Sequence, residues 1–479
     1  MVNKDKRIYE LKLINNKELV NIWVHLHSML SALWEDPKIV ASILMNSNPK
    51  DILHSLLPLF ANNFYENILS QKFVQNNLLY LITLLLKHEI TTYCNLLYPK
   101  NFLNINSTCG YLLYELRNKR DFQIFIKEII EEVVEIIDEN PYNICFNIDK
   151  IECKIRREFS VVKKDNKINK KEKLKEDSGF NDLTIERIDI YLKHSEEIDE
   201  IKKRYFSEDI KNDFNEINPI IKEYYSKTFD LQKENEYQFF ANSIKYFSNL
   251  ISKRKDKNII YSYYLYDFYL VTKFIEKFLN NLLDKINIIP YSVRVIAKII
   301  SILITKKYKN ISIIKRNTFI CRFFFCALFW PTSENSNDSW SIANFSISRQ
   351  SINNILYIEN IFNEFIMGEL YREKKNYEFF PFNLFFIEKM DLLIKFIEEL
   401  IDVDLPEFII KSIEDDNYIF DYIKENENDG IINRSICFKI DDIYDMIICT
   451  MKKNENIFLK NNKLKFPYQA LTKMQILVY

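Results

Sequence analysis

The sequence predicts an all-α fold, and three observations support the prediction. Apolar residues recur with helical spacing along most of the chain, as expected where one face of each helix packs on a core. Only four of the 479 residues are glycine and eleven are proline, a composition that fits long helices better than turn-rich sheets. Hydrophobic residues make up 47% of the chain and aromatic residues 15%, which is enough for a large core.

The first helices are marked by their ends and by their apolar faces. Asp36 and Pro37 form a helix start, with a carboxylate cap before a proline at a position where no N–H is needed. Residues 78–90 are apolar enough to form a central buried helix. Over 122–137 the apolar residues form one stripe and the glutamates the opposite face, which predicts an amphipathic helix.

A change of composition interrupts this pattern. Residues 152–178 are charged, rich in lysine and poor in large apolar groups, which predicts a flexible segment. Charged helices are expected to follow, so the insertion is placed at about 152–235. We therefore expect one helical domain over 1–400 that contains this insertion, and a helical extension over 401–479 that packs on it. A basic arm that contacts acidic lipid is an alternative role for the insertion.

Core-type pattern returns in the second half of the chain. Helical spacing over 271–286 and 293–304 predicts two helices separated by a break before Pro290. Arg294 and Lys298 lie opposite the apolar face of the second helix and are interpreted as solvated. A hydrophobic block and two further helices are expected at 319–331, 346–367 and 383–401.

Charge and residue counts exclude several classes of function. With 66 basic and 67 acidic side chains, the chain lacks the general positive charge of a nucleic-acid-binding protein. Four scattered glycines cannot form a phosphate-binding loop or a dinucleotide-binding motif. His25 and His27 are two residues apart, so on a helix they point away from each other, and no metal or cofactor is expected. The eight cysteines include no C-x-x-C pair, which favours reduced thiols in an intracellular protein.

Three stretches, in order, resemble the Ras-type GTPase-activating (Ras-GAP) domain, and IQGAP-type domains in particular. The first is IPYSVRVIAKII at 289–300, similar to a helix late in that domain. The second is CRFFFCALFWP at 321–331, where the family has an arginine, a Pro-Ala pair and a closing proline, and this chain has Arg322, Cys-Ala and Pro331. The third is SRQSINNILYI at 348–358, similar to the family pattern R-R-N-L-x-x-I-A-K.

The N-terminal half adds to this resemblance. LWEDPKIVASILM at 33–45, the apolar run at 78–90 and STCGYLLYEL at 107–116 resemble the Ras-GAP module at the head of endosomal Rab-exchange factors. The resemblance covers about 20–400, without a recognisable Rab-exchange domain after it. It implies a Ras-GAP-like helical domain with a charged insertion, and a small GTPase of the Ras or Rab type as partner.

The catalytic arginine of the family is replaced in this chain. The family's finger loop reads F-L-R-x-N-S, and residues 102–107 read FLNINS, so Asn104 stands at the finger position. A register shifted by two residues would put Asn106 there instead. Lys100 is the nearest preceding cation, four residues away, and is a candidate GTPase contact.

Further site residues are implied by the resemblance alone. Arg322 corresponds to the family arginine that hydrogen-bonds the finger loop from behind, and its alternative role is to satisfy buried carbonyl groups. Ser351 and Tyr357 stand where the family has asparagine and lysine on the GTPase-facing groove. Arg349 is retained, with a solvated helix position as its alternative.

Three functional hypotheses follow. The first is a Ras-GAP-like protein that binds a small GTPase with weak or no activation, as an effector or scaffold in endosomal vesicle traffic. The second is an active GTPase-activating protein that uses a different residue. The third is a helical structural protein that retains only the fold. The N-terminus has no apolar signal core, and the longest uncharged runs are shorter than the ~20 apolar residues of a spanning helix, so we expect a cytoplasmic protein, with peripheral association with endosomal or vesicle membranes as an alternative.

Overall fold

The fold of the chain is seen in a computed structural model. It describes residues 36–46, 72–96, 99–104, 107–117, 120–138, 142–156, 193–206, 217–229, 236–329, 348–372, 374–415 and 454–475, with residues 140 and 451 and short pieces between 24 and 33. All regular elements of these residues are helical and none is a strand, which confirms the all-α prediction.

The regular elements of the described residues are α-helices with a few shorter helical segments between them. The α-helices are α3 (Pro37–Asn46), α6 (Lys72–Thr92), α7 (Thr108–Arg117), α8 (Arg120–Asp138), α11 (Ser195–Tyr205), α13 (Pro219–Phe229), α14 (Glu236–Ser252), α15 (Lys257–Asp284), α16 (Tyr291–Lys307), α17 (Ile313–Cys321), α19 (Arg349–Ile366), α20 (Pro381–Ile401), α21 (Glu407–Glu414), α23 (Glu455–Lys460) and α24 (Asn462–Gln475). The 3₁₀ helices, which have tighter turns, are η2 (Pro99–Asn101), η4 (Ile286–Ile288) and η6 (Lys374–Phe379). The π-helix, which has wider turns, is η5 (Arg322–Phe329).

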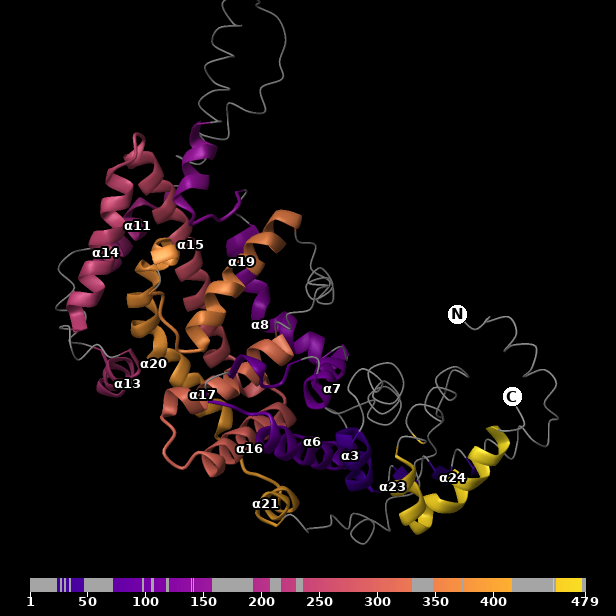
Figure 1. Cartoon of the computed structure of the whole chain (residues 1–479). Helices are drawn as coiled ribbons and strands as arrows, with labels where there is room; N and C mark the ends of the chain where they lie inside the picture. The colour runs from indigo at the N-terminus through magenta and orange to yellow at the C-terminus, as the bar shows by residue number, and fades with distance from the viewer. Residues whose placement is uncertain are drawn as a thin grey trace, which may run out of the picture.

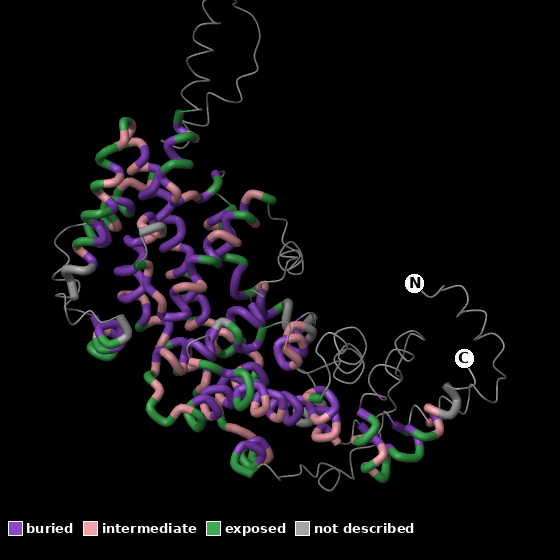
Figure 2. Tube along the Cα trace, in the orientation of Figure 1, coloured by how far each residue is buried: buried purple, intermediate pink, exposed green. Residues whose placement is uncertain are grey.

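Helix α15 is the centre of the larger group of helices. It has 28 residues, most of them buried, and it packs against α8, α20, α11 and α14 (Figure 1). A helix that is apolar almost all round has to be enclosed by others, because an exposed apolar side would cost hydrophobic free energy. Figure 2 shows the buried stretches of these helices facing one another.

A second group is built around α6, the apolar helix predicted at 78–90. Helix α6 packs against α3, α16, α21 and α7. The side chains of Leu78, Leu81 and Leu86 are fully buried there. Helix α16 connects the two groups because it also contacts α20 and α17.

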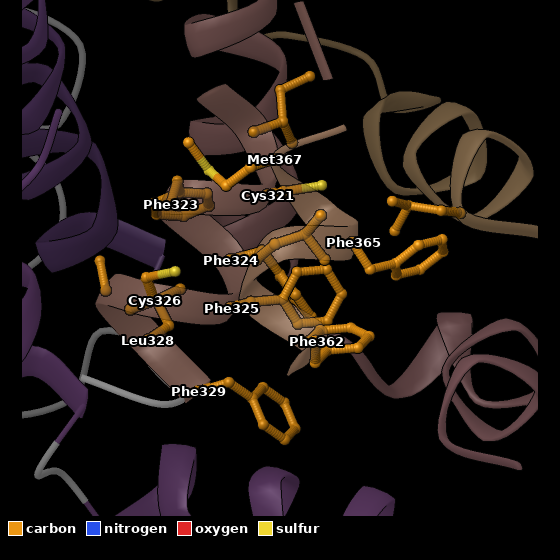
Figure 3. Packing of buried hydrophobic residues seen from close by; sticks show 14 of the residues in the cluster. Cys321, Phe323, Phe324, Phe325, Cys326, Leu328, Phe329, Phe362, Phe365 and Met367 are labelled. Atoms are coloured by element: carbon orange, nitrogen blue, oxygen red, sulfur yellow. The ribbon is translucent and has the colours of Figure 1, made fainter. Parts of the chain in front are cut away.

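Of the hydrophobic block predicted at 319–331, residues 319–329 form the end of α17 and a π-helical segment, η5. All of its described residues except Arg322 are buried (Figure 3). The Phe325 ring lies edge-on to Phe362 of α19 at 5.0 Å between ring centres, and the Phe324 ring lies 5.2 Å from Phe396 of α20. The wider π-helical turn, which the sequence analysis did not predict, carries three consecutive phenylalanines into this aromatic core.

Several sequence-based boundaries are confirmed. Helix α3 begins at Pro37, and the Asp36 carboxylate accepts the N–H groups of Lys38 and Ile39 at 3.1 and 3.3 Å. From Phe125 onward, the stripe predicted at 122–137 is the buried face of α8. The break before Pro290 separates α15 and η4 from α16.

The interpretation of Arg294 and Lys298 as solvated residues was wrong. The Arg294 guanidinium donates to the carbonyl oxygens of Glu399 and Asp402, both at 2.9 Å, and Lys298 Nζ donates to that of Val403. These carbonyl groups lie at the C-terminal end of α20, where a helix has unpaired acceptors and partial negative charge. The two side chains therefore join α16 to α20.

Within the range expected for the insertion, the structure describes two helices that pack on the rest of the protein. Helix α11 contacts α15 and α20, and its Arg204 pairs with Glu388 of α20 at 2.7 Å. Helix α13 contacts α20. Residues 152–156, predicted as the start of the flexible segment, are helical, and Glu152 and Ile155 are buried, so that boundary was wrong. Residues 157–192 lie outside the described residues, so flexibility there stays a prediction.

The segment after residue 400 also makes contact with the helical body. Helix α21 packs on α6, and its last turn receives hydrogen bonds from Lys87 of α6 and Lys306 of α16. Helices α23 and α24 pack on each other, and α23 lies beside α3.

Candidate functional site

The loop that joins α6 to α7 holds the predicted finger position. Phe102 and Leu103 are buried, with 2% and 4% of their surface exposed, whereas Asn104 is exposed. The Phe102 ring lies edge-on to Phe319 of α17 at 5.5 Å between ring centres. Two apolar anchors therefore hold the loop on the core and leave Asn104 at the surface. The alternative finger residue, Asn106, lies outside the described residues.

The backbone of this loop is held in an uncommon conformation. Leu103 has a φ of +54°, the left-handed region that costs a residue with a side chain about 1–2 kcal/mol. Its N–H donates to Glu89 Oε1 at 2.9 Å. Such a conformation persists only where the surrounding structure compensates for it, and strained residues of this kind are concentrated at functional sites.

Gly110, in the first turn of α7, allows the loop to close. A Cβ atom at this position would lie 2.2 Å from the Asn104 carbonyl oxygen and 2.8 Å from that of Leu103. No side chain fits in that space. The Gly110 N–H donates to Ser107 Oγ at 3.0 Å, and the Ser107 N–H donates to the Asn104 carbonyl at 2.7 Å. One of the chain's few glycines is thus required by the backbone directly behind Asn104.

Glu89 of α6 connects these parts of the loop. Its side chain is 4% exposed and is hydrogen-bonded to the Leu103 N–H, the Ser107 side chain and the Cys109 backbone. Burial raises the pKa of the Glu89 carboxyl to about 7, and the three hydrogen bonds only partly oppose this rise. A carboxylate buried in an apolar helix is costly, so its retention here is explained by the loop that it organises.

Arg322, the predicted support of the loop, is half-buried at the start of η5. It follows Phe319 by three residues, and Phe319 is the residue that contacts Phe102 of the loop. The structure therefore brings the helical segment of Arg322 to the loop. A hydrogen bond from its guanidinium to the loop backbone stays a prediction.

Ser351 was expected on a partner-facing groove, and the structure instead buries it. It is 1% exposed, and its Oγ donates to Asp138 Oδ1 of α8 at 2.7 Å. Its N–H donates to Ser348 Oγ at 3.0 Å, which caps the start of α19. Ser351 therefore joins α19 to α8 and is not available to a partner.

Tyr357 is also used inside the protein. Its ring stacks on Phe146 at 6.1 Å between ring centres, and the Phe146 N–H donates to its hydroxyl. Burial raises the pKa of this hydroxyl well above its usual range. The side chain joins α19 to the segment at 142–147, which has no regular structure, so Tyr357 fits a structural role better than a GTPase contact.

The remaining predicted contacts, Arg349 and Lys100, come from separate parts of the fold. Arg349 is exposed at the first residue of α19, beside the C-terminal end of α8. The loop with Asn104 leads into α7, which lies toward the other end of α8 (Figure 1). Lys100 lies in η2, next to this loop, and its side chain is outside the described part of the structure.

Sequence reasoning missed two residues besides Glu89 and Gly110. Asn354 of α19 is buried, and its amide donates to the Tyr142 carbonyl at 2.8 Å and accepts from the Ile144 N–H at 2.9 Å. Asp267 of α15 accepts the Cys145 N–H at 2.9 Å. A polar residue within an apolar helical stripe is the signal that could have identified all three polar side chains.

The described residues contain no group of His, Cys, Asp and Glu side chains that could hold a metal ion. Their six cysteines are free thiols. Among the described helices, none combines the length and the apolar composition needed to cross a membrane. No family model matches the chain, and no curated protein matches its sequence. In the part of the chain that the structure describes, fold and site therefore define an all-helical protein that holds a neutral asparagine, Asn104, at an exposed position of a constrained loop.

Proposed function

We propose that this protein binds a small GTPase of the Ras or Rab type at the surface around Asn104 and leaves the GTPase's hydrolysis rate near its intrinsic value. The observation that carries the proposal is the constrained loop at 102–110, with a strained Leu103, an obligatory Gly110 and an exposed Asn104 between them. A loop held in this way on rigid helices is suited to present one residue to a partner. The resemblance to Ras-GAP domains supplies the class of partner.

The expected absence of activation follows from the charge of the exposed residue. Activators of this type stabilise the charge that develops on the departing γ-phosphoryl group with an arginine, which is worth roughly 10³–10⁵ in rate. A guanidinium is planar and permanently charged, whereas the Asn104 amide is neutral. In a site from which water is excluded, this difference has a large effect on the barrier.

Such a protein acts as an effector or scaffold in the cytoplasm. Endosomal or vesicle membranes, with peripheral contact to the lipid surface, are the proposed place of action, by analogy with the Rab-exchange factors that the N-terminal half resembles. Nucleic acid is not a proposed partner.

Binding is tested first. The full chain is immobilised and incubated with Ras- and Rab-type GTPases, each loaded with GDP or with a non-hydrolysable GTP analogue. We expect one GTPase to be retained in a nucleotide-dependent manner, and Asn104→Asp to weaken its retention by placing a negative charge against the bound nucleotide. If no GTPase is retained in either nucleotide state, the helical structural protein becomes the better hypothesis.

Hydrolysis is tested with the GTPase that binds. In single-turnover assays we expect the wild-type chain to leave the rate within about twofold of the intrinsic rate. Asn104→Arg should raise the rate by at least about tenfold but by less than the roughly 10³–10⁵ of a complete arginine finger. Recovery is expected to be partial because Ser351 and Tyr357, at two further family positions, are occupied inside the protein.

Arg322→Ala in the Asn104→Arg background serves as the matched test of loop support. It should remove most of the gain if the Arg322 side chain steadies the loop. Strong activation by the wild-type chain would contradict the proposal and favour an active GTPase-activating protein, with Lys100 as the first residue to replace.

A further inference from the structure

Two short segments meet at one end of the helical body, and both are rich in basic residues. The first is the helix at 148–156, and the second is the turn at 253–257 that joins α14 to α15 (Figure 1). Together they contain seven lysine and arginine residues and three aspartate and glutamate residues, which gives a formal charge of +4. The whole chain has a net charge of -1, so positive charge is concentrated at this end, which we call the basic tip.

Arg254 of the turn holds the two segments of the basic tip together. Its guanidinium pairs with Asp149 at 2.6 Å and with Glu152 at 2.9 Å, both on the helix at 148–156. The Arg156 guanidinium pairs with Glu152 as well. A planar, forked guanidinium is suited to fixed contacts with carboxylates. These two arginines are therefore used within the protein, where they neutralise two of the three carboxylates of the tip.

The lysines of the basic tip lie at the surface instead. Four of them are exposed, and none of the four has an ion pair with another side chain in the described part of the chain: Lys150, Lys253, Lys255 and Lys257. Lys257 is the first residue of α15, and Lys150 is in the first turn of the helix at 148–156. A positive charge at the N-terminal end of a helix is opposed by the helix dipole. The positions of these two lysines are therefore unfavourable for the fold, and a negatively charged partner would explain them.

We propose that the basic tip is a docking surface for the anionic headgroups of a phospholipid membrane. This inference rests on the proposed function only for the place of action, and it assigns residues to the lipid contact. Basic side chains near an anionic membrane each contribute about fivefold in affinity. Four exposed lysines on two joined segments are enough for an attraction that depends on lipid charge and on salt.

The character of the basic tip favours a lipid surface over nucleic acid. Its outward-facing charges are lysines, which are mobile point charges and need no fixed partner geometry, as suits a layer of mobile headgroups. They lie at the projecting end of packed helices rather than along one helix that could enter a groove (Figure 2).

Tyrosines lie beside the charges of the tip. The Tyr377 hydroxyl of η6 is close enough to Asp149 and Arg254 for their charges to affect it, and its ring lies edge-on to Tyr246 of α14 at 6.2 Å between ring centres. Tyr246 is 38% exposed. Tyrosine combines an apolar ring with a polar hydroxyl and is enriched where a protein meets the surface of a membrane.

Co-sedimentation of the full chain with vesicles tests the inference without any GTPase. One set of vesicles is phosphatidylcholine alone, and the other contains about one third phosphatidylserine, which supplies a negative surface potential. At about 0.1 M salt we expect the wild-type chain to sediment only with the anionic vesicles, and about 0.5 M salt should release it because the charges are then screened. Failure to sediment with the anionic vesicles would overturn the inference.

Replacement of the exposed lysines by glutamine assigns the binding to the tip. A chain with all four of them replaced should have a partition coefficient at least about 100-fold lower, because each lysine contributes about fivefold. A control chain loses the same total charge at four scattered exposed positions: Lys227, Lys309, Lys395 and Lys465. The control should stay within about threefold of wild type, because distant charges are screened at this salt concentration. Equal losses in both chains would show an effect of net charge alone. Unchanged binding after replacement at the tip would assign the lipid contact to another part of the chain, and either result would overturn the inference.

Asp149→Asn provides a variant whose expected effect is a gain, which misfolding cannot produce. The Asp149 side chain is 66% exposed, and Arg254 retains its pairing with Glu152. Removal of one negative charge from the tip should raise the partition coefficient by about fivefold. Glu223→Gln, which removes an exposed negative charge from α13, should give no such gain. Equal behaviour of the two variants would contradict the assignment to the tip.

Duplex DNA is the competing ligand and is tested in the same buffer. Binding of DNA that the four substitutions at the tip abolish, together with vesicle sedimentation that they leave unchanged, would assign the tip to nucleic acid and overturn the proposal. The result with vesicles is also independent of the GTPase. If vesicles bind through the tip and no GTPase is retained, the tip is assigned correctly and the GTPase function is wrong. If a GTPase is retained and vesicles are not bound, the inference on the tip is wrong and the GTPase contact stands.

Discussion

At the scale of single residues, the loop between α6 and α7 depends on the absence of a side chain at Gly110 and on the hydrogen bond from the Leu103 N–H to Glu89. Gly110 lacks a Cβ atom at the point where the backbone of Asn104 approaches α7 most closely. Leu103 has a left-handed backbone conformation that its N–H bond to Glu89 offsets. At Gly110 no residue with a side chain fits, so a substitution there should have a large effect.

Gly110→Ala is expected to lower the free energy of unfolding by about 1–3 kcal/mol, the usual cost of forcing extra atoms into a packed site. The cost arises because backbone atoms, which cannot rotate away, surround the new methyl group. Urea unfolding of the variant, compared with Asn101→Ala at an exposed position of the preceding turn, measures it. Equal stability of both variants would show that the loop adapts to the side chain.

At the scale of elements, basic side chains of helix α16 form hydrogen bonds with the C-terminal ends of other helices. Its Arg294 and Lys298 donate to carbonyl groups at the end of α20, its Lys306 to the end of α21 and its Lys307 to the end of α6. Each pairing satisfies acceptors that a helix cannot pair by itself and opposes the negative end of its dipole. The positions of α6 and α20 relative to each other therefore depend on charged side chains as well as on apolar packing.

Arg294→Met is expected to destabilise the chain by about 1.5–3 kcal/mol, the range for hydrogen bonds made by a charged group. Methionine retains an apolar stem of similar length, so the loss reports the guanidinium contacts with Glu399 and Asp402 rather than packing. Lys395→Met is the matched control, because Lys395 is an exposed lysine on α20 whose ion pair with Glu399 is long, at 4.0 Å. The difference in urea midpoint between the two variants is the measurement.

At the scale of the whole molecule, both sides of the charged insertion contribute to one core. Asn281 of α15 donates to the Ile129 carbonyl of α8 at 3.3 Å, and Arg254, which precedes α15, pairs with Asp149 at 2.6 Å. Contacts of this kind join residues more than a hundred positions apart. The described parts before and after the insertion therefore share one core, and we expect them to unfold together as one domain.

Cleavage within 157–178 should therefore leave the two fragments associated. A recognition site for a specific protease is inserted in this range, and the cleaved chain is analysed by size-exclusion chromatography under native conditions. We expect co-elution at the position of the intact chain, and separation only in denaturant. Two independently folded pieces that elute apart would contradict the single-domain fold.

The sequence by itself determined the helical class and the positions of several described helices, among them α3, α8 and α16. These features are local: the start of α3 depends on Asp36 and Pro37, and the buried face of α8 on a repeat that spans only a few residues. Composition likewise excluded phosphate-binding loops, because that argument needs only the number and spacing of glycines.

Tertiary structure alone decided which polar residues serve the fold and which stay on the surface. Arg294 and Ser351 look like solvent-facing or partner-facing residues until the carbonyl groups of α20 and the Asp138 carboxylate are placed beside them. Glu89 acquires its role only when Leu103 and Ser107 close around it. A side chain's helical phase is set by its neighbours in sequence, but its hydrogen-bond partners are set by how distant segments pack, and the sequence pattern does not contain that information.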